Sequence, residues 1–275
     1  MRRSDLAFSI TTWNINSVRL RLPLVQHFLE TARPDVLCLQ ETKCPNDSFP
    51  SAAFRKLGYE HIAIHGQKGY HGVAIISRLP LSDDQRKTYC EIDHTRNISA
   101  IVEAPGDRRI RIHNFYVPAG GDEPDREINP KFGHKLDFIE EMKCLHADAE
   151  QADGISSILV GDLNIAPLET DVWSHKQLLK VVSHTPVETE GLVAMQQAGG
   201  WVDLIRAHIP PEEKIFTWWS YRAQDWDAAD RGRRLDHVWS SADLLPSLTR
   251  VDVLREARGW ERPSDHVPVT AHFAF

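Results

Sequence analysis

The sequence predicts an α/β sandwich, in which mixed β-sheets are covered by helices. Short runs of apolar and β-branched residues, typical of strands, recur along the chain at 8–14, 35–41, 72–78, 98–104, 110–117, 156–164, 235–241 and 267–275. Between them, apolar residues spaced three or four apart predict helices over 21–33 and 131–150. Connections of both hairpin length and helix length favour mixed sheets over purely parallel ones.

The length of the chain and its lack of repeats or linkers favour a single domain over 1–275. A chain of 275 residues can bury a full core as one large domain or two small ones. It contains no internal repeat, low-complexity tract or long linker that would mark a boundary.

The composition, 41% hydrophobic and 26% charged, is that of an ordinary globular protein. No apolar run approaches the roughly 20 residues of a membrane span, and the N-terminal segment lacks the apolar core of a signal peptide. We therefore expect a cytoplasmic protein without a membrane partner. The formal net charge of -7 disfavours non-specific coating of nucleic acid, although it is compatible with a local basic groove.

The four cysteines, Cys38, Cys44, Cys90 and Cys144, include no CxxC pair. In a cytoplasmic protein, this favours reduced thiols over disulfides or a zinc site.

Polar side chains follow three of the predicted strands. Because side chains alternate along a strand, Leu37, Leu39 and Glu41 share one face, so an apolar face ends in a carboxylate. Polar pairs of equal parity close two other strands, namely Asn14 with Asn16 and Asp162 with Asn164. Each residue alone has a simpler interpretation, as a solvated strand end or as turn chemistry.

Together, these groups indicate a metal site and phosphoryl transfer. Oxygen ligands gathered at one end of a core suit Mg²⁺, which takes one or two carboxylates plus phosphate oxygens, so Glu41 and Asp265 would suffice. Hydrolysis of a phosphodiester further needs an in-line water, a base and hydrogen-bond donors. Asp162 is the candidate base, with Asn164 and His266 as donors.

Tyr116 leaves alternatives open, and the neighbours Asp265 and His266 raise the question of which way each side chain points. Tyr116 would be a donor or a proton source, but its phenol could equally be a packed, hydrogen-bonded core group. Asp265 and His266 are adjacent, yet neighbours in an extended segment point to opposite sides, so we expect each to serve a different partner.

Eight motifs, in order, resemble the exonuclease III family of Mg²⁺-dependent apurinic/apyrimidinic endonucleases. They are TTWNINSVR, DVLCLQETK, GYHGVAIISR, NFYVPAGG, LVGDLNIAP, FTWWSYR, RLDHVWSS and PSDHVPV, and they span 11–269. The family belongs to the endonuclease/exonuclease/phosphatase superfamily, which includes deoxyribonuclease I. The resemblance implies a four-layer α/β sandwich, with two mixed β-sheets packed face to face and flanked by helices.

The resemblance also implies roles for individual residues. The metal-site positions it implies are Asn14, Glu41, Asp162, Asn164 and Asp265. The catalytic positions are Tyr116, Asp162, Asn164, Asp236 and His266. His266 would contact the phosphate while Asp236 orients it, because a carboxylate on one imidazole nitrogen fixes the tautomer and favours the imidazolium. Taken alone, Asp236 would be a strand-edge residue near Arg234.

For substrate binding, Trp218 matches the aromatic residue of the family's pocket for a base-less sugar, and Leu235 lies at an apolar wall position. Such a pocket admits a flipped deoxyribose that lacks its base; alternatively, Trp218 packs in the core. Arg96 resembles a phosphate-contacting arginine. Five further basic residues could line a DNA groove, although charge runs are usually solvated faces: Lys43, Arg222, Arg231, Arg233 and Arg234.

Two segments depart from the family pattern. His175 and His184 lie where we expect the chain to face the substrate; they would bias the enzyme between abasic-site incision and 3′-end trimming, or be exposed without function. The acidic residues Asp122, Glu123 and Asp125 should disfavour close approach of DNA if they lie at the groove.

The prediction is thus a monomeric nuclease of base excision repair that uses Mg²⁺, with Mn²⁺ as a substitute. It would hydrolyse the phosphodiester 5′ to abasic sites in double-stranded DNA and trim blocked 3′ ends. The alternatives are a superfamily phosphatase acting on a lipid or inositol phosphate, and a catalytically inactive DNA-binding homologue. The number of metal ions and the balance of activities stay open.

Overall fold

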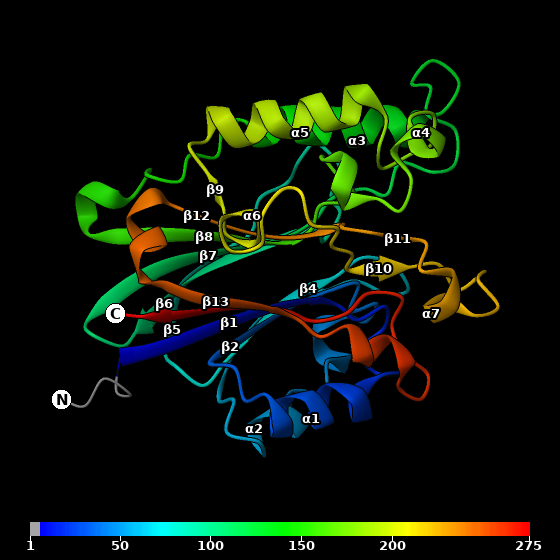
Figure 1. The fold of residues 1–275 in the computed structure, drawn as a ribbon. Coiled ribbons are helices and arrows are strands. Elements are labelled where there is room, and N and C mark those ends of the chain that lie inside the picture. The colour runs from blue at the N-terminus through cyan, green and yellow to red at the C-terminus, as the bar shows by residue number, and fades with distance from the viewer. Residues whose placement is uncertain (1–5) are drawn as a thin grey trace.

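Two six-stranded mixed sheets pack face to face in the computed structural model, which describes residues 6–275 (Figure 1). The first sheet has the order β13 (Leu248–Val253), β14 (Val269–Ala274), β1 (Ala7–Asn14), β2 (Val36–Gln40), β4 (Val73–Ser77) and β3 (His61–His65). The second has the order β5 (Leu81–Gln85), β6 (Asn97–Ala104), β7 (Arg108–Tyr116), β8 (Ile155–Asp162), β12 (Asp236–Ser240) and β9 (Val202–Asp203). A separate pair consists of β10 (Trp218–Trp219) and β11 (Gly232–Arg233). Every predicted strand is present.

Helices cover the outer face of each sheet, which gives the predicted four layers (Figure 1). On one side lie α1 (Leu22–Thr31) and α2 (Ser51–Arg55), and on the other α3 (Pro130–Met142) and α5 (Pro186–Ala198). The shorter helices are α4 (His175–Leu178), α6 (Leu204–His208) and α7 (Trp226–Ala229). Short 3₁₀ helices occupy Asn46–Ser48, Gln151–Asp153, Glu169–Asp171, Ala242–Ser247 and Arg255–Gly259. None of the helices in the described part of the chain is long and apolar enough to span a membrane.

Local sequence accounts for the starts of the two long covering helices of the second sheet. The Asn129 side chain accepts from the Lys131 amide at the start of α3, and Thr185 and Glu188 form a capping box at the start of α5. The helix predicted over 131–150 ends early, at Met142. There the chain turns, and the Leu145 carbonyl accepts from Trp201 Nε1 at 3.0 Å, so a tertiary contact replaces further helical turns.

The sandwich mixes parallel and antiparallel pairs, and this places strand ends together. The pairs β1/β2 and β7/β8 are parallel, and the remaining neighbours within each six-stranded sheet are antiparallel. Asn14, Tyr116 and Asp162 are the last residues of β1, β7 and β8, and Asp236, the first residue of β12, pairs with Asp162. These strand ends meet at one end of the sandwich, opposite the C-terminus (Figure 1), and carry the four residues.

A glycine permits the close strand contact beside this end. Gly161 has φ +147°, and a Cβ there would lie 1.9 Å from the Phe115 carbonyl oxygen. Any other residue would push β8 away from β7 and displace the neighbouring Asp162.

Candidate active site

Glu41 follows β2 directly and takes a left-handed backbone conformation, with φ 50°. The strand alternation stops at Gln40, so the parity argument that placed Glu41 on the face of Leu37 and Leu39 is wrong. Those two leucines pack against α1 in a cluster that includes Phe28, whereas Glu41 lines a cleft at the end of the sandwich. Glu41 therefore reaches the predicted meeting point by a backbone turn.

The acidic end of this cleft, which we define as Glu41, Asp162 and Asp265, is tied together by amides. Asn14 Nδ2 donates to Glu41 Oε1 at 3.0 Å and to Asp162 Oδ2 at 2.8 Å. Asn16 Nδ2 donates to Asp265 Oδ1 at 3.1 Å. Asn14 and Asn16, paired in the sequence prediction, thus bridge all three carboxylates.

A basic group already lies among these oxygens. Lys43 Nζ is 2.8 Å from Glu41 Oε2 and 2.6 Å from Asn16 Oδ1. Burial raises the pKa of Glu41, but Lys43 and the amide of Asn14 outweigh it, so the net pKa is lowered and the carboxylate is anionic. Carboxylate and amide oxygens around a cation are the donor set of a hard metal ion, so Glu41 and its neighbours fit one.

Of the three carboxylates at the acidic end, Asp162 accepts the most hydrogen bonds. Oδ1 accepts from the Asn164 backbone amide at 2.9 Å, and Oδ2 accepts from Asn164 Nδ2 at 3.1 Å as well as from Asn14. Complete burial raises the pKa of Asp162 to about 7, while the nearby His266 opposes the rise. A carboxylate with a pKa near neutrality is suited to take a proton from water.

His266 is held by a carboxylate on each side. Its Nδ1 lies 2.8 Å from Asp236 Oδ2, and its Nε2 lies 3.6 Å from Asp162 Oδ2. Burial would lower the pKa of His266, but Asp236 and Asp162 raise it to about 10, so the ring is an imidazolium at neutral pH. Thr217 Oγ1 donates to the same Asp236 oxygen at 2.6 Å and fixes its position.

The adjacent Asp265 turns the other way. Asp265 Oδ2 accepts from Trp218 Nε1 at 3.0 Å, while Oδ1 faces Asn16. The expected divergence of Asp265 and His266 is therefore confirmed. Burial raises the pKa of Asp265, but His266 and the Trp218 and Asn16 hydrogen bonds outweigh it and leave the pKa lowered. The three residues Asp162, Asp236 and His266 also form a compact group of potential metal-binding side chains.

Tyr116 lies at the wall of the cleft and Arg96 lies behind it. Burial and the carboxylates of Glu41 and Asp162 raise the pKa of Tyr116 well above its usual range, so its hydroxyl stays protonated. The Arg96 guanidinium lies 4.9 Å from the Tyr116 ring centroid and donates to its carbonyl at 3.2 Å. Arg96 is 7% exposed and supports the tyrosine.

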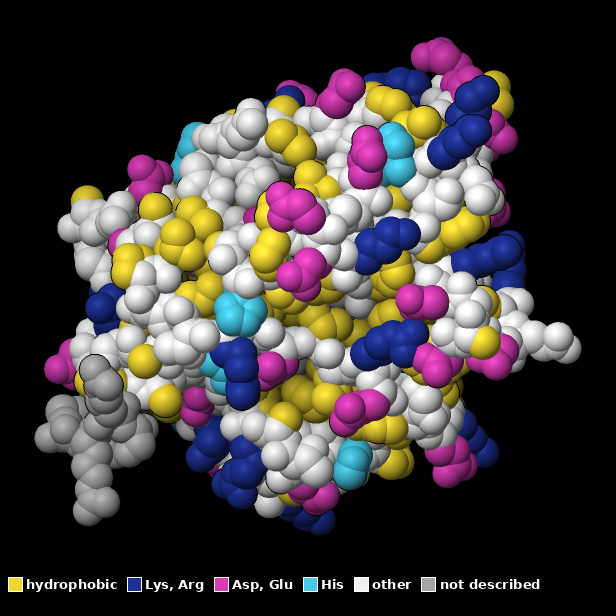
Figure 2. Space-filling model, in the orientation of Figure 1, with side chains coloured by type: hydrophobic (Ala, Val, Ile, Leu, Met, Phe, Trp, Pro, Cys, Tyr) yellow, Lys and Arg dark blue, Asp and Glu magenta, His cyan; other side chains and the backbone are white. Residues whose placement is uncertain are grey.

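The cleft has a volume of about 550 Å³ and joins the acidic end to an aromatic and basic end. We define the basic end by six lining residues, Trp173, Trp218, Arg222, Arg231, Arg233 and Leu235. The structure thus brings Trp218, Leu235 and Arg222 beside the carboxylates, as predicted. Outside the cleft, Figure 2 shows acidic, basic and apolar side chains mixed over one face of the molecule, with no surface of one sign.

Two residues that we expected at the groove or facing the substrate, Arg234 and His184, are buried instead. Arg234 does not line the groove: it is fully buried, with Nε 2.7 Å from Asp171 Oδ1 and Nη1 2.8 Å from Asp203 Oδ2. His184 is buried and hydrogen-bonds to the Ala166 carbonyl at 2.6 Å and to His175 at 2.8 Å, so neither expected role fits it.

The acidic segment divides in the structure. Asp122 lines the cleft, whereas Glu123 and Asp125 lie outside its lining. Only one of the three carboxylates therefore opposes an anion in the cleft.

A buried ion pair that the sequence analysis missed supports two cleft walls. Lys135 Nζ lies 2.5 Å from Glu188 Oε1 and donates to the Asn164 carbonyl at 2.8 Å. Glu188 in turn accepts from the Ser183 and Thr185 amides. Thr217, which holds Asp236, was also missed. Sequence periodicity marks Lys135 only as a residue of the helix predicted over 131–150, predicts no helix around Glu188, and leaves Thr217 as one polar residue among aromatics.

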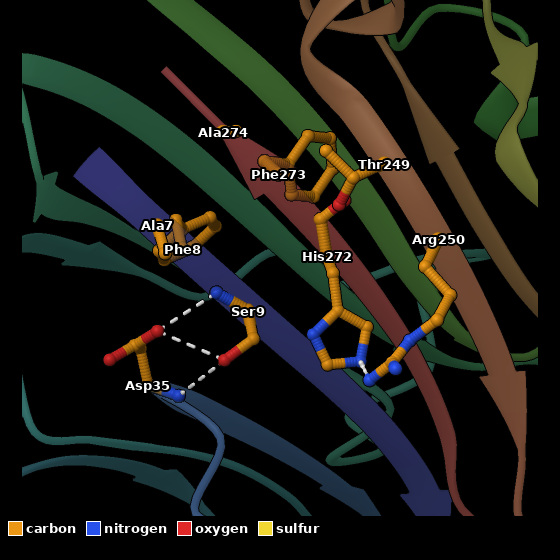
Figure 3. Close-up of a pocket in the computed structure, with 9 residues that line it drawn as sticks. All are labelled: Ala7, Phe8, Ser9, Asp35, Thr249, Arg250, His272, Phe273 and Ala274. Carbon is orange, nitrogen blue, oxygen red and sulfur yellow. Dashed lines mark hydrogen bonds between the residues drawn. The ribbon is translucent and has the colours of Figure 1, made fainter. Parts of the chain in front are cut away.

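A second hollow of about 470 Å³ lies along β13, β14 and β1 of the first sheet, away from these carboxylates (Figure 3). Its polar groups satisfy one another: Asp35 Oδ2 accepts from the Ser9 amide and hydroxyl, both at 2.9 Å, and His272 meets Arg250 at 3.3 Å (Figure 3). It contains none of the residues that the sequence analysis assigned to a site.

Comparison with known proteins decides the family. A model of the endonuclease/exonuclease/phosphatase family matches residues 11–266. The chain belongs to this family. Exodeoxyribonuclease III from Haemophilus influenzae is 30% identical to it over 271 residues, which cover 95% of this chain and 98% of that protein.

Solved structures agree. An AP endonuclease from Archaeoglobus fulgidus superimposes with a TM-score of 0.86 at 31% identity, over 98% of this chain and all (100%) of that one. The 3′ phosphatase NExo from Neisseria, bound to a product DNA hairpin, superimposes with a TM-score of 0.87 at 33% identity, over 98% and 100% of the two chains. The predicted fold and the prediction of a phosphodiester-hydrolysing DNA-repair nuclease are confirmed, and nucleases of this family depend on a metal ion.

Proposed function

We propose that this protein is a Mg²⁺-dependent nuclease of base excision repair, acting on duplex DNA as a single-domain cytoplasmic monomer. It hydrolyses the phosphodiester 5′ to abasic sites and trims blocked 3′ ends. The observation that carries the proposal is the position of Asp162, which shares Asn14 with Glu41 and lies 3.6 Å from His266. A general base (Asp162), a hydrogen-bond donor to the phosphate (His266) and a carboxylate that would bind the metal (Glu41) therefore lie close together.

Asp162 is the general base. Its Oδ2 is occupied by two amide donors, while Oδ1 has only the Asn164 backbone amide, so Oδ1 retains a lone pair for a water proton. The amides fix the carboxylate before the water arrives, which avoids reorganisation during the reaction.

His266 stabilises the charge that builds on the phosphate. Because Asp236 occupies Nδ1, the protonated Nε2 is the nitrogen available to donate to a phosphate oxygen. Tyr116 supplies a second donor with its protonated hydroxyl. Asn164 would be a third donor if its Nδ2, which donates here to Asp162 Oδ2 and to the Val117 carbonyl, turned to the phosphate.

Glu41 and Asp265 would hold Mg²⁺, with Asn14, Asp162 and Asn164 completing its surroundings; when bound, Mg²⁺ neutralises phosphate charge and stabilises the leaving oxygen. Mn²⁺, which accepts the same oxygen ligands, should substitute. In this structure Asn14 directs its nitrogen at both carboxylates.

The substrate residues follow from their places in the cleft. Trp218 and Leu235 form the pocket wall beside His266, and Arg222 faces the DNA backbone. Arg96 acts on the phosphate through Tyr116, against which it is buried. The names of the similar proteins, exodeoxyribonuclease III, AP endonuclease and 3′ phosphatase, support both the incision and the trimming reactions.

The test uses a duplex that contains one abasic analogue, incubated with the protein in Mg²⁺ or in EDTA. Incision on the 5′ side in Mg²⁺ alone is expected. Absence of cleavage with every divalent metal would instead favour an inactive DNA-binding homologue. Release of phosphate from an inositol phosphate without DNA cleavage would favour a phosphatase.

A further inference from the structure

The basic end of the cleft presents guanidinium groups on its aromatic faces. The Arg233 guanidinium carbon lies 5.2 Å from the Trp218 ring centroid, and that of Arg231 lies 4.9 Å from the Trp173 ring centroid. A pocket for an uncharged, base-less sugar would present the bare indole face of Trp218. Here a cation shares that face.

Arg233 differs from its neighbour Arg234 in how its charge is balanced. Arg234 is fully buried and paired with Asp171 and Asp203. Arg233 donates from Nη1 to the Val182 carbonyl at 2.9 Å and to Ser183 Oγ at 2.7 Å, and both acceptors are neutral. Within residues 6–275, no carboxylate forms an ion pair with Arg233; Glu188 acts on its charge without contacting it and is paired with Lys135. Neither Nε nor Nη2 of Arg233 has a hydrogen-bond acceptor there. The half-buried Arg233 guanidinium, with Nη2 available at the wall of the cleft, would be stabilised by a bound anion.

The strand pairing places Trp218 between Arg233 and His266, the residue proposed to contact the phosphate. Trp218 pairs directly with Arg233 in β11 and also forms an antiparallel bridge with His266. Directly opposed residues have Cα atoms about 4.5–5.5 Å apart and side chains on the same face, so the Arg233 and His266 Cα atoms are roughly 10 Å apart. Because His266, Trp218 and Arg233 line the same cleft, a substituent a few bonds long on a phosphate at His266 would extend along Trp218 toward Arg233.

We propose that Arg233 makes this pocket select an oxyanion carried on the scissile phosphate, so that 3′ ends capped by a charged group are preferred over ends capped by a neutral group of equal size. A 3′-phosphoglycolate, in which a carboxylate lies one carbon beyond the phosphate ester oxygen, has this chemistry. The inference rests on the proposed nuclease function and adds a specificity residue to it.

The reaction is the one derived above. The water oxygen bonds to phosphorus, and the bond from phosphorus to the 3′ oxygen breaks. Phosphoglycolate is released, and the DNA strand then ends in a 3′ hydroxyl. One proton passes from the water to Asp162 and then to solvent, and the departing 3′ oxygen takes up one proton from solvent. Arg233 binds the carboxylate throughout and takes no part in the transfer.

Two duplexes test the proposal, one ending in 3′-phosphoglycolate and one in its uncharged analogue, the 3′-phospho-2-hydroxyethyl ester. We expect kcat/KM to be about tenfold higher for the charged end in the wild type, the size of one charge-assisted hydrogen bond. Arg233→Gln should abolish the ratio by slowing only the charged end, and Arg233→Lys, which keeps the charge, should restore most of it. Arg222→Gln, the matched control, should leave the ratio unchanged.

The outcomes distinguish failure of the proposed anion pocket from failure of the proposed nuclease function. If the wild type processes neither end and does not incise the abasic analogue, the nuclease function fails. If it processes both ends with equal kcat/KM, or if Arg233→Gln slows both equally while thermal unfolding is unaltered, the nuclease stands and the anion pocket is overturned. If Arg233→Gln has a lowered melting temperature, Arg233→Met replaces it, because Met keeps an unbranched apolar side chain beside Trp218 and removes the charge.

Discussion

The acidic and basic ends of the cleft satisfy their charges in opposite ways. At the acidic end, Asp162 alone accepts three hydrogen bonds from two asparagines, and Glu41 and Asp265 are each held by an amide. At the basic end, Arg233 stacks on an indole and has no carboxylate partner among the described residues. The first arrangement fixes geometry in advance, as chemistry requires. The second leaves charge available to an anionic substrate.

The largest expected effect in this comparison is that of His266→Asn, which removes the imidazolium beside the acidic end. We expect kcat to fall at least about tenfold, roughly 1.4 kcal/mol, because the imidazolium no longer donates to the phosphate. Steady-state turnover on the abasic duplex measures the effect, with circular dichroism to show that the fold is intact. A folded variant with full activity would remove His266 from the mechanism.

Asp236→Asn is the matched variant for that test, since Asp236 acts through His266. It should reduce kcat by less, and the double variant should lose less than the sum of the two single effects, because both changes interrupt one unit. Additive losses would show that the two residues act independently.

Glu41→Ala tests the metal-binding part of the acidic end. Removing one of two proposed carboxylate ligands should raise the Mg²⁺ concentration for half-maximal activity, on the order of tenfold, with activity partly recovered at high Mg²⁺. Titration of activity against Mg²⁺ measures this shift. An unchanged titration excludes Glu41 as a ligand, and Glu60→Ala, which alters an exposed carboxylate away from the cleft, is the control.

Residue patterns predicted which strands form and which polar residues lie together at their ends. They predicted less well the backbone conformation that brings each of these residues there. Asp162 follows the alternation of β8, because Ile158 and Val160 face the same core between the sheets. Glu41 does not, because a left-handed residue ends the alternation, and alternation rules carry no signal for a positive φ at glutamate.

Charge was the least predictable property of the site. Arg231, Arg233 and Arg234 stand together in the sequence, yet two line the cleft and the third is buried between Asp171 and Asp203. The difference depends on partners far away in the chain, which local sequence does not encode. The resemblance to the exonuclease III family supplied the roles of Asp236 and Trp218. The pattern of residues alone indicated a strand-edge residue for Asp236 and packing for Trp218.

The smallest expected effect belongs to Arg222→Gln at the basic end. Arg222 lines the cleft but is exposed and, among the residues described, makes no ion pair, so we place it against the DNA backbone. Loss of one phosphate contact should raise KM a few-fold with kcat unchanged, and should reduce the slope of log binding affinity against log salt by about 1. Binding measured at several salt concentrations, with the metal replaced by Ca²⁺ to prevent cleavage, gives the slope. A fall in kcat with an unaltered salt slope would instead place Arg222 with the acidic end, and the division of the cleft into a fixed chemical end and an open binding end would fail there.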